Sequence, residues 1–249
     1  MKKVSVLTGI LVTLLLSSLT TLAQIKSRED VLKEINAKRA ELADLEKAYL
    51  SPAEEDQVQF SEFLQTPNTG LVRLLPRQKF DSDVYKENQR SMTLRGGGAF
   101  YSFSRLTHEY GGGSDLALDQ NQFWVGFAGS DYGFFTALGD VPLESVSAET
   151  PAAALFGAYK AAKDEAAART EYRRLVSPVD LGGIPIRNRV PVRVNSTYLL
   201  RSIGYLRSDV LVAFRVVRMD ADGSVTILWK LLKKYETPGS KRPETAVAQ

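Results

Sequence analysis

The spacing of apolar residues changes from a helical period before residue 66 to a mainly strand-like period after residue 70. Ser27 followed by Asp30 is an N-cap pattern, so a helix is predicted to begin there. We expect this helix to lie on the body of the domain; self-association through 27–50 as a short coiled coil is the alternative, because only about three heptads fit. Five apolar residues fall on one stripe of this helix with steps of four and three, interrupted by Lys38: Val31, Ile35, Leu42, Leu45 and Tyr49.

A second helix is predicted to follow directly. Ser51 is a candidate cap, Pro52 suits the first helical position, and the segment TPN should end the helix at about Gln65. The two helices would form an N-terminal helical hairpin over 24–69. Three large side chains are its expected anchors: Phe60, Phe63 and Leu64.

Residues 70–237 are predicted to form a β-rich domain. An alanine-rich stretch near 150–176 interrupts it and is predicted to be helical, with Thr150 as its cap and Pro151 at its first position. Before this insertion, five short segments alternate with glycine and aspartate at hairpin spacing: GLVRLLP, AFYSFSRL, SDLALD, FWVGFAG and YGFFTALG.

Strand character returns after the insertion. In 184–194, Pro185 and Pro191 share a face with the arginines, which favours an edge strand. The two apolar runs around Asp222-Gly223 predict a long hairpin covered on both faces, and residues 238–249 predict a disordered tail. The expected fold class is α+β, mainly β: antiparallel meanders forming a sandwich or partly open barrel, with an N-terminal helical hairpin and an alanine-rich helix between the β halves.

Residues 1–23 have the order of a secretory signal peptide, with basic Lys2 and Lys3 before an apolar core and a small-residue exit at Ala23. We therefore expect an exported protein, periplasmic or extracellular, with no transmembrane span after signal removal. An uncleaved anchor is the alternative, because Val4 to Ala23 is just long enough to cross a bilayer.

The composition excludes several kinds of site. The chain has no cysteine and one histidine, His108. Thiol nucleophiles, cysteine-ligated zinc, iron–sulfur clusters and multi-histidine zinc sites are thereby excluded, and we expect neither a metal nor a cofactor. The net charge of +3 gives no indication of nucleic-acid binding.

Two glycine triplets, at 96–98 and 111–113, raise the question of a phosphate-binding loop. Such a loop needs a glycine turn that leads from a strand into a helix. Both triplets are instead followed by strand-like sequence, AFYSFS and SDLALD. We expect the glycines to be turn residues that adopt positive φ.

Catalytic candidates cluster between residues 96 and 150. His108 could act as a general base oriented by Asp115, and Glu109 and Asp119 are further candidates. Paired carboxylates could instead hydrolyse a glycoside, although aspartates beside glycines are more often turn residues. This stretch has one basic residue, Arg105, and seven acids: Glu109, Asp115, Asp119, Asp131, Asp140, Glu144 and Glu149.

Ligand-binding candidates come from a tryptophan and three arginines. Trp124 points away from the face shared by its neighbours in FWVGF, and such a ring can stack on a sugar or pack beneath a helix. Arg187, Arg189 and Arg193 lie in a strongly basic second half, which either faces the acidic stretch or meets an anionic partner such as a polysaccharide or an envelope protein.

Three functions follow as hypotheses. The first is an exported, non-catalytic binding or structural module. The second is a carboxylate-based hydrolase, glycosidase-like, that uses the acids in 96–150. The third is an envelope assembly protein that oligomerises through its N-terminal helix.

Overall fold

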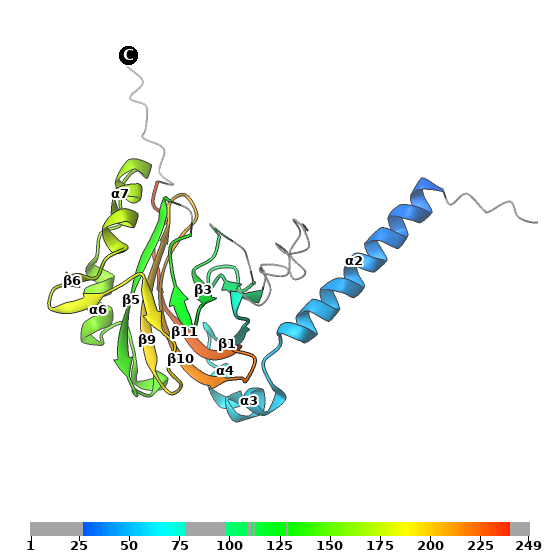
Figure 1. The fold of residues 1–249 in the computed structure, drawn as a ribbon, viewed down its shortest axis with the longest axis horizontal. Helices are drawn as coiled ribbons and strands as arrows, with labels where there is room; N and C mark the ends of the chain where they lie inside the picture. The colour runs from blue at the N-terminus through cyan, green and yellow to red at the C-terminus, as the bar shows by residue number, and fades with distance from the viewer. Residues whose placement is uncertain (1–26, 78–97, 109–110, 112, 128, 240–249) are drawn as a thin grey trace, which may run out of the picture. The chain divides into compact units, whose positions relative to one another are not determined.

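The computed structural model describes residues 27–77, 98–108, 111, 113–127 and 129–239 (Figure 1). The predicted signal peptide and almost all of the predicted tail lie outside these residues. The chain divides into two compact units, Met1–Leu45 and Glu46–Gln249. In the described part of the chain, no helix combines the length and the apolar character needed to cross a bilayer.

Helix α2 (Arg28–Leu50) begins after Ser27, whose hydroxyl accepts a hydrogen bond from the amide of Asp30, as the capping pattern predicts. No residue of α2 is buried. The five residues of the apolar stripe are 40–62% exposed. A helical period shows which face is apolar and leaves open what covers it.

The predicted second helix is broken into two short ones, α3 (Glu54–Gln59) and α4 (Ser61–Leu64). The break is at Phe60, where φ is −101° and ψ is 14°. Ser51 does not cap α3; its hydroxyl donates instead to the carbonyl of Lys47. The three expected anchors, Phe60, Phe63 and Leu64, do pack against buried residues of the β-rich part.

The largest layer is a five-stranded antiparallel sheet in the order β1-β11-β10-β9-β5. The predicted C-terminal hairpin is confirmed, with Gly223 at φ 86° in its turn, and the first residues of each strand are buried on both faces. Every residue of β9 is buried as well. The strands are β1 (Thr69–Leu74), β5 (Asp131–Gly139), β9 (Thr197–Gly204), β10 (Ser208–Met219) and β11 (Val225–Lys234).

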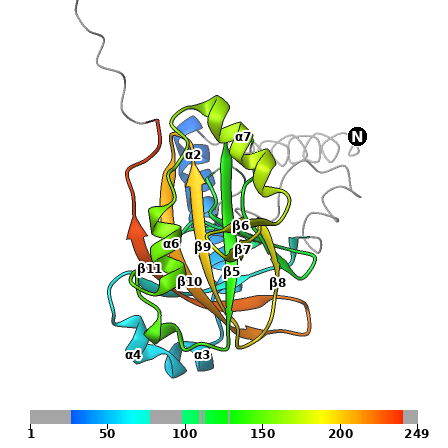
Figure 2. The same cartoon turned by 90° about the vertical axis from the view of Figure 1, so that its left-hand side faces the viewer.

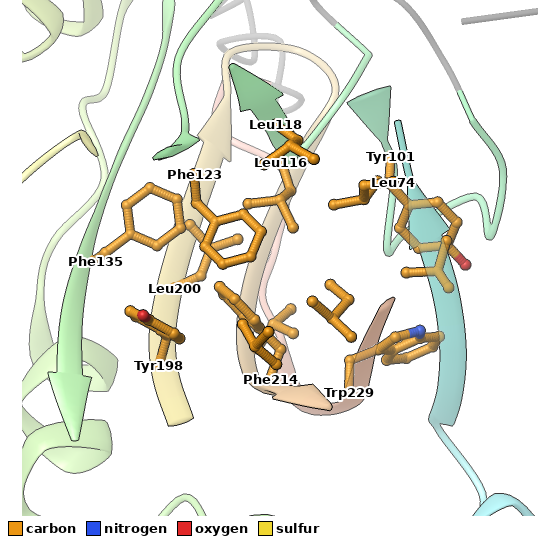
Figure 3. Packing of buried hydrophobic residues seen from close by; sticks show 14 of the residues in the cluster. Leu74, Tyr101, Leu116, Leu118, Phe123, Phe135, Tyr198, Leu200, Phe214 and Trp229 are labelled. Carbon is orange, nitrogen blue, oxygen red and sulfur yellow. The ribbon is translucent and has the colours of Figure 1, made fainter. Parts of the chain in front are cut away.

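A smaller antiparallel sheet, in the order β2-β3-β4-β8, packs on one face of the large sheet. Figure 3 shows side chains of both sheets meeting in this core, among them Phe123 and Leu116 opposite Phe214 and Leu200. β8 is an edge strand, as Pro191 predicts. The strands are β2 (Phe100–Tyr101), β3 (Leu116–Asp119), β4 (Gln122–Trp124) and β8 (Arg189–Pro191).

Helices cover the opposite face of the large sheet (Figure 2). The predicted single helix near 150–176 is two helices, α6 (Pro151–Ala158) and α7 (Glu165–Leu175). The second starts at Asp164, whose carboxylate accepts from the amide of Ala167. A short hairpin follows, made of β6 (Val179–Leu181) and β7 (Ile184–Ile186), and a 3-10 turn, η2 (Leu143–Ser145), precedes α6. The fold is thus α+β and mainly antiparallel β, and the described residues form no closed barrel.

Both glycine triplets act as turns, as far as their residues are described. Gly98 has φ 65° and Gly111 has φ 76°, and the next named elements are strands β2 and β3. Positive φ is the conformation for which glycine is preferred. No helix follows either triplet, so the prediction of turns is confirmed.

Candidate functional site

A groove of about 280 Å³ lies between the edge of β5 and the segment that leads from β7 through β8 to β9. Two of the predicted ligand-binding arginines, Arg187 and Arg193, line it. Its other lining residues include Phe135, Ala137, Pro185 and Tyr198.

The groove opens because a strand pairing stops early. Phe135 of β5 exchanges two backbone hydrogen bonds with Arg187, at 2.7 and 3.2 Å. In an antiparallel ladder the next pair would be Ala137 with Pro185, and proline has no N–H to donate. The pairing ends after one bridge, and β7 pairs with β6 instead.

The edge of β5 beyond this bridge faces the groove. Successive strand residues turn their backbone groups to alternate edges, so Ala137, like Phe135, directs its N–H and C=O away from β9. The irregularity in the β5–β9 register comes after it, between Ala137 and Gly139. Ala137 is exposed. Outside the ladders of the named strands, neither its N–H nor its C=O bonds to another described backbone group.

Tyr198 fixes the opposite wall. Its hydroxyl donates to the carbonyl of Pro191 at 2.7 Å and accepts from the amide of Arg193 at 3.1 Å. Its ring stacks on Phe214 in the core, with centroids 5.2 Å apart. The backbone that carries Arg193 is therefore tied to the sandwich.

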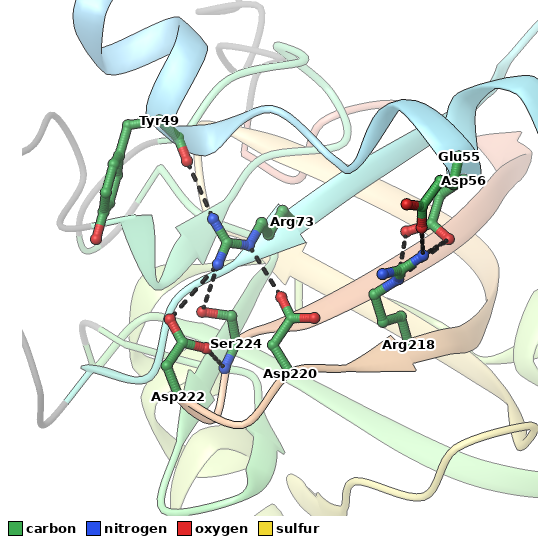
Figure 4. Close-up of polar contacts among 8 residues, drawn as sticks. All are labelled: Tyr49, Glu55, Asp56, Arg73, Arg218, Asp220, Asp222 and Ser224. Carbon is green, nitrogen blue, oxygen red and sulfur yellow. Dashed lines mark hydrogen bonds and ion pairs between the residues drawn. The ribbon is translucent and has the colours of Figure 1, made fainter.

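Most arginines of the large sheet are neutralised by an acid. Figure 4 shows Arg73 between Asp220 and Asp222, and Arg218 between Glu55 and Asp56. Arg201, Arg207 and Arg215 also have acidic partners: Asp209, Asp131 and Asp140 respectively.

The two groove arginines differ from this pattern. In the part of the chain that the structure describes, no acidic side chain forms an ion pair with Arg187 or Arg193. The pairs of Arg207 with Asp131 and of Arg215 with Asp140 do join the basic second half to the acidic stretch, as one of the two sequence interpretations expects. Pairing between the two halves does not account for Arg187 and Arg193, which line the groove without an acidic partner among the described residues.

Trp124 and Arg189 lie together, outside the groove lining. They are cross-strand neighbours on β4 and β8, and the guanidinium carbon of Arg189 lies 4.5 Å from the Trp124 ring centroid. The edge of the Trp124 ring also packs on Phe127. Trp124 is half-buried, so the ring is neither the freely exposed sugar platform nor the fully covered core residue considered from the sequence.

His108 is half-buried against the β2 segment. Its Nδ1 lies 3.0 Å from the carbonyl oxygen of Phe100, and its ring packs edge-on against Tyr101. Burial lowers the pKa of His108 to about 4, so the ring is neutral near pH 7. Among the described contacts no hydrogen bond joins the side chains of His108 and Asp115, so the structure does not join them as a base and its orienting acid.

Asp115 is fully buried and shapes the backbone. It accepts hydrogen bonds from two amides, those of Phe103 and Ser104, at 2.7 and 3.3 Å. These bonds bend the chain after Tyr101, so the predicted strand AFYSFSRL is a strand only at Phe100–Tyr101. Burial raises the pKa of the Asp115 carboxyl, and its hydrogen bonds lower it. Three hydroxyls also donate to Asp115, those of Ser102, Ser202 and Ser208.

The remaining acidic candidates are dispersed. Asp119 ends β3 beside a turn in which Gln120 and Asn121 have positive φ, and Glu109 lies outside the described residues. Asp131 is buried beside Arg207. Asp140, Glu144 and Glu149 are exposed. None of the described acids lines the groove, whereas a glycosidase site needs two accessible carboxylates across a cleft.

Sequence reasoning found Arg187 and Arg193 but missed the residues that make a groove around them. The backbone pairing of Phe135 with Arg187 joins residues far apart in the sequence, so no local pattern predicts it. Pro185, which cannot continue this pairing, is the one local indication. Within the described ranges, no group of three or more histidine or acidic side chains is arranged to hold a metal ion. No protein-family model matches this chain, and neither a curated protein sequence nor a solved structure shows significant similarity to it.

Proposed function

We propose that this protein is an exported, non-catalytic binding module whose ligand site is the groove between β5 and the β7–β8 segment. The ligand is anionic, and Arg187 and Arg193 bind it. The observation that carries this proposal is that these two arginines line a groove without an acidic partner among the described residues, whereas the four arginines of the large sheet, and Arg207 in its β9–β10 turn, each have one.

The chemistry of arginine supports an anionic ligand. A guanidinium group presents a planar fork of donors that matches carboxylate, sulfate or phosphate oxygens. Binding at such a site does not have to displace a resident acid. Export is supported by the signal-peptide order of residues 1–23.

The proposal is tested by titrating the protein with short polyglutamate and polyuronate oligomers in a calorimeter at low ionic strength. Arg187→Gln and Arg193→Gln should each weaken binding about fivefold. Arg189→Gln is the matched control, because it removes the same charge beside Trp124 and outside the groove. Equal affinities for all four proteins would refute the proposal.

A second proposal concerns self-association through α2, as an envelope assembly protein would require. It is favoured by the exposure of Leu42 and the other four stripe residues. Burying such a face against a second copy removes apolar surface from water. Leu42→Glu should lower the molar mass measured by light scattering, and Ala40→Glu, which adds the same charge on the opposite face, should not. If the wild type and both variants are monomeric, self-association through α2 is contradicted.

A further inference from the structure

We infer that the ligand of the groove is an extended acidic peptide segment, which pairs with the free edge of β5 through its backbone. This inference rests on the proposed function and specifies the class of its ligand. An anionic polysaccharide would use the same arginines but has no amide backbone to pair with the strand.

The edge of β5 supplies the backbone recognition. Ala137 lines the groove and turns its N–H and C=O to the outer edge of β5, and outside the ladders of the named strands neither group bonds to another described backbone group. An edge strand with unpaired groups is a template for a further strand. An incoming peptide residue can exchange two hydrogen bonds with Ala137, as Arg187 does with Phe135.

The facing wall does not compete for the peptide backbone. Pro185 and Pro191 line that wall, and neither has an N–H. The wall instead carries the charges of Arg187 and Arg193. Backbone pairing on one side and side-chain charge on the other is the combination that an acidic peptide satisfies.

The size and lining of the groove limit how much of a peptide can enter it and which side chains suit it. A volume of about 280 Å³ lies near the lower end of ligand pockets, which span roughly 300–1,000 Å³, so only a short part of a peptide enters. The exposed apolar residues that line the groove beside the arginines are Ala137, Pro185 and Pro191. An extended peptide that alternates acidic and apolar residues presents one kind of side chain on each face.

The test uses a fluorescein-labelled hexapeptide of alternating glutamate and valine with blocked ends, and measures fluorescence anisotropy. Two further peptides carry methyl groups on every second amide nitrogen, one in each register. Trigalacturonate, which has the same number of carboxylates, is the competitor. The proteins are the wild type, Arg187→Gln, Arg193→Gln, Arg189→Gln and Ala137→Pro.

Ala137→Pro removes the N–H that faces the groove and keeps the ladder between β5 and β9, because edge strands accept proline where its nitrogen faces outward. We expect the unmethylated peptide to bind and at least one methylated register to lose binding. Ala137→Pro should weaken binding about fivefold, the effect of one hydrogen bond. The methylated peptides provide the same information with the wild-type protein if Ala137→Pro does not fold.

The outcomes separate the two proposals. If Arg187→Gln and Arg193→Gln weaken binding but both methylated peptides bind like the parent, the anionic groove stands and backbone pairing is refuted. If trigalacturonate binds as tightly as the peptide or more tightly, and Arg187→Gln and Arg193→Gln weaken its binding, a peptide ligand is also refuted. If no anionic probe binds, or the arginine variants change nothing relative to Arg189→Gln, both proposals fail.

Discussion

The side chains of Arg201 and Asp209 form an ion pair inside the β-rich unit, with Nε 2.6 Å from Oδ1 and both side chains 2% exposed. A second bond joins Nη2 to Oδ2 at 2.9 Å. The guanidinium also donates to the carbonyl of Phe156 and lies 3.3 Å from the ring centroid of Tyr235. Because water cannot solvate either group, each charge depends on the other.

We predict that Asp209→Ala lowers the free energy of unfolding by about 3–5 kcal/mol, because it leaves the buried charge of Arg201 without its partner. Urea denaturation measures this change. The control is Glu165→Ala, which removes the partner of Arg169 at the same 2.6 Å distance in a pair whose side chains are 53% and 55% exposed. The control should lose less than about 1 kcal/mol. Similar losses in the two variants would contradict the prediction.

Parts of the fold follow from local sequence because local chemistry decides them. The turn at Gly223 needs positive φ between two apolar runs, and a strand containing Pro191 cannot be central in a sheet. Both conditions hold in the structure.

Other features depend on contacts between distant segments. Strand β9, which lies between β5 and β10 in the large sheet, includes the polar residues Thr197, Arg201 and Ser202, yet all its residues are buried. Arg201 is tolerated there only because Asp209 and Phe156 lie beside it. The groove likewise joins β5 to residues about fifty positions later, and no local pattern specifies that pairing.

Gly98 and Gly111, the triplet glycines with positive φ, should respond differently to alanine. At Gly111 a Cβ atom would have no heavy atom within 4 Å, so Gly111→Ala should cost only the conformational strain of positive φ, about 1–2 kcal/mol. At Gly98 a Cβ atom would lie 2.5 Å from the side chain of Leu75, which is fully buried. Overpacking should add about 1–3 kcal/mol to the same strain. Thermal unfolding of the two variants measures both losses of stability. A smaller loss for Gly98→Ala than for Gly111→Ala would contradict the prediction.

His108 should not titrate in its usual range. As the only histidine, it gives one ring Hε1 signal in the NMR spectrum, which needs no assignment. Burial lowers its pKa to about 4, whereas the unfolded chain should have a value of about 6.5. Between these values only the unfolded state binds the proton, so the His108 contribution to stability is present above pH 6.5 and is lost as the pH falls towards 4. A midpoint near 6.5 in the folded protein would show that the ring is solvated.

Asp131 should have the opposite effect on stability in nearly the same pH range. Its pKa is raised to about 6, mainly by burial; the charge of Arg207 opposes this rise and that of Asp115 adds to it. Its Oδ1 is buried without a hydrogen-bond partner. Between about pH 4, the usual value for an unfolded aspartate, and pH 6, the folded state holds a proton that the unfolded state has lost. The Asp131 contribution therefore increases stability as the pH falls from 6 to 4.

Removing one of the two groups should expose the effect of the other. Relative to the wild type, Asp131→Asn should lose about 2 kcal/mol more stability between pH 6.5 and pH 4, since each pKa unit corresponds to about 1.4 kcal/mol. His108→Gln should lose correspondingly less than the wild type over the same interval. Urea denaturation at both pH values measures these differences, and comparison with the wild type removes the contributions of all other groups. The double variant should return to the wild-type dependence of stability on pH, because the two effects oppose each other. Parallel stability profiles for the wild type and the two single variants would show that neither group has a shifted pKa.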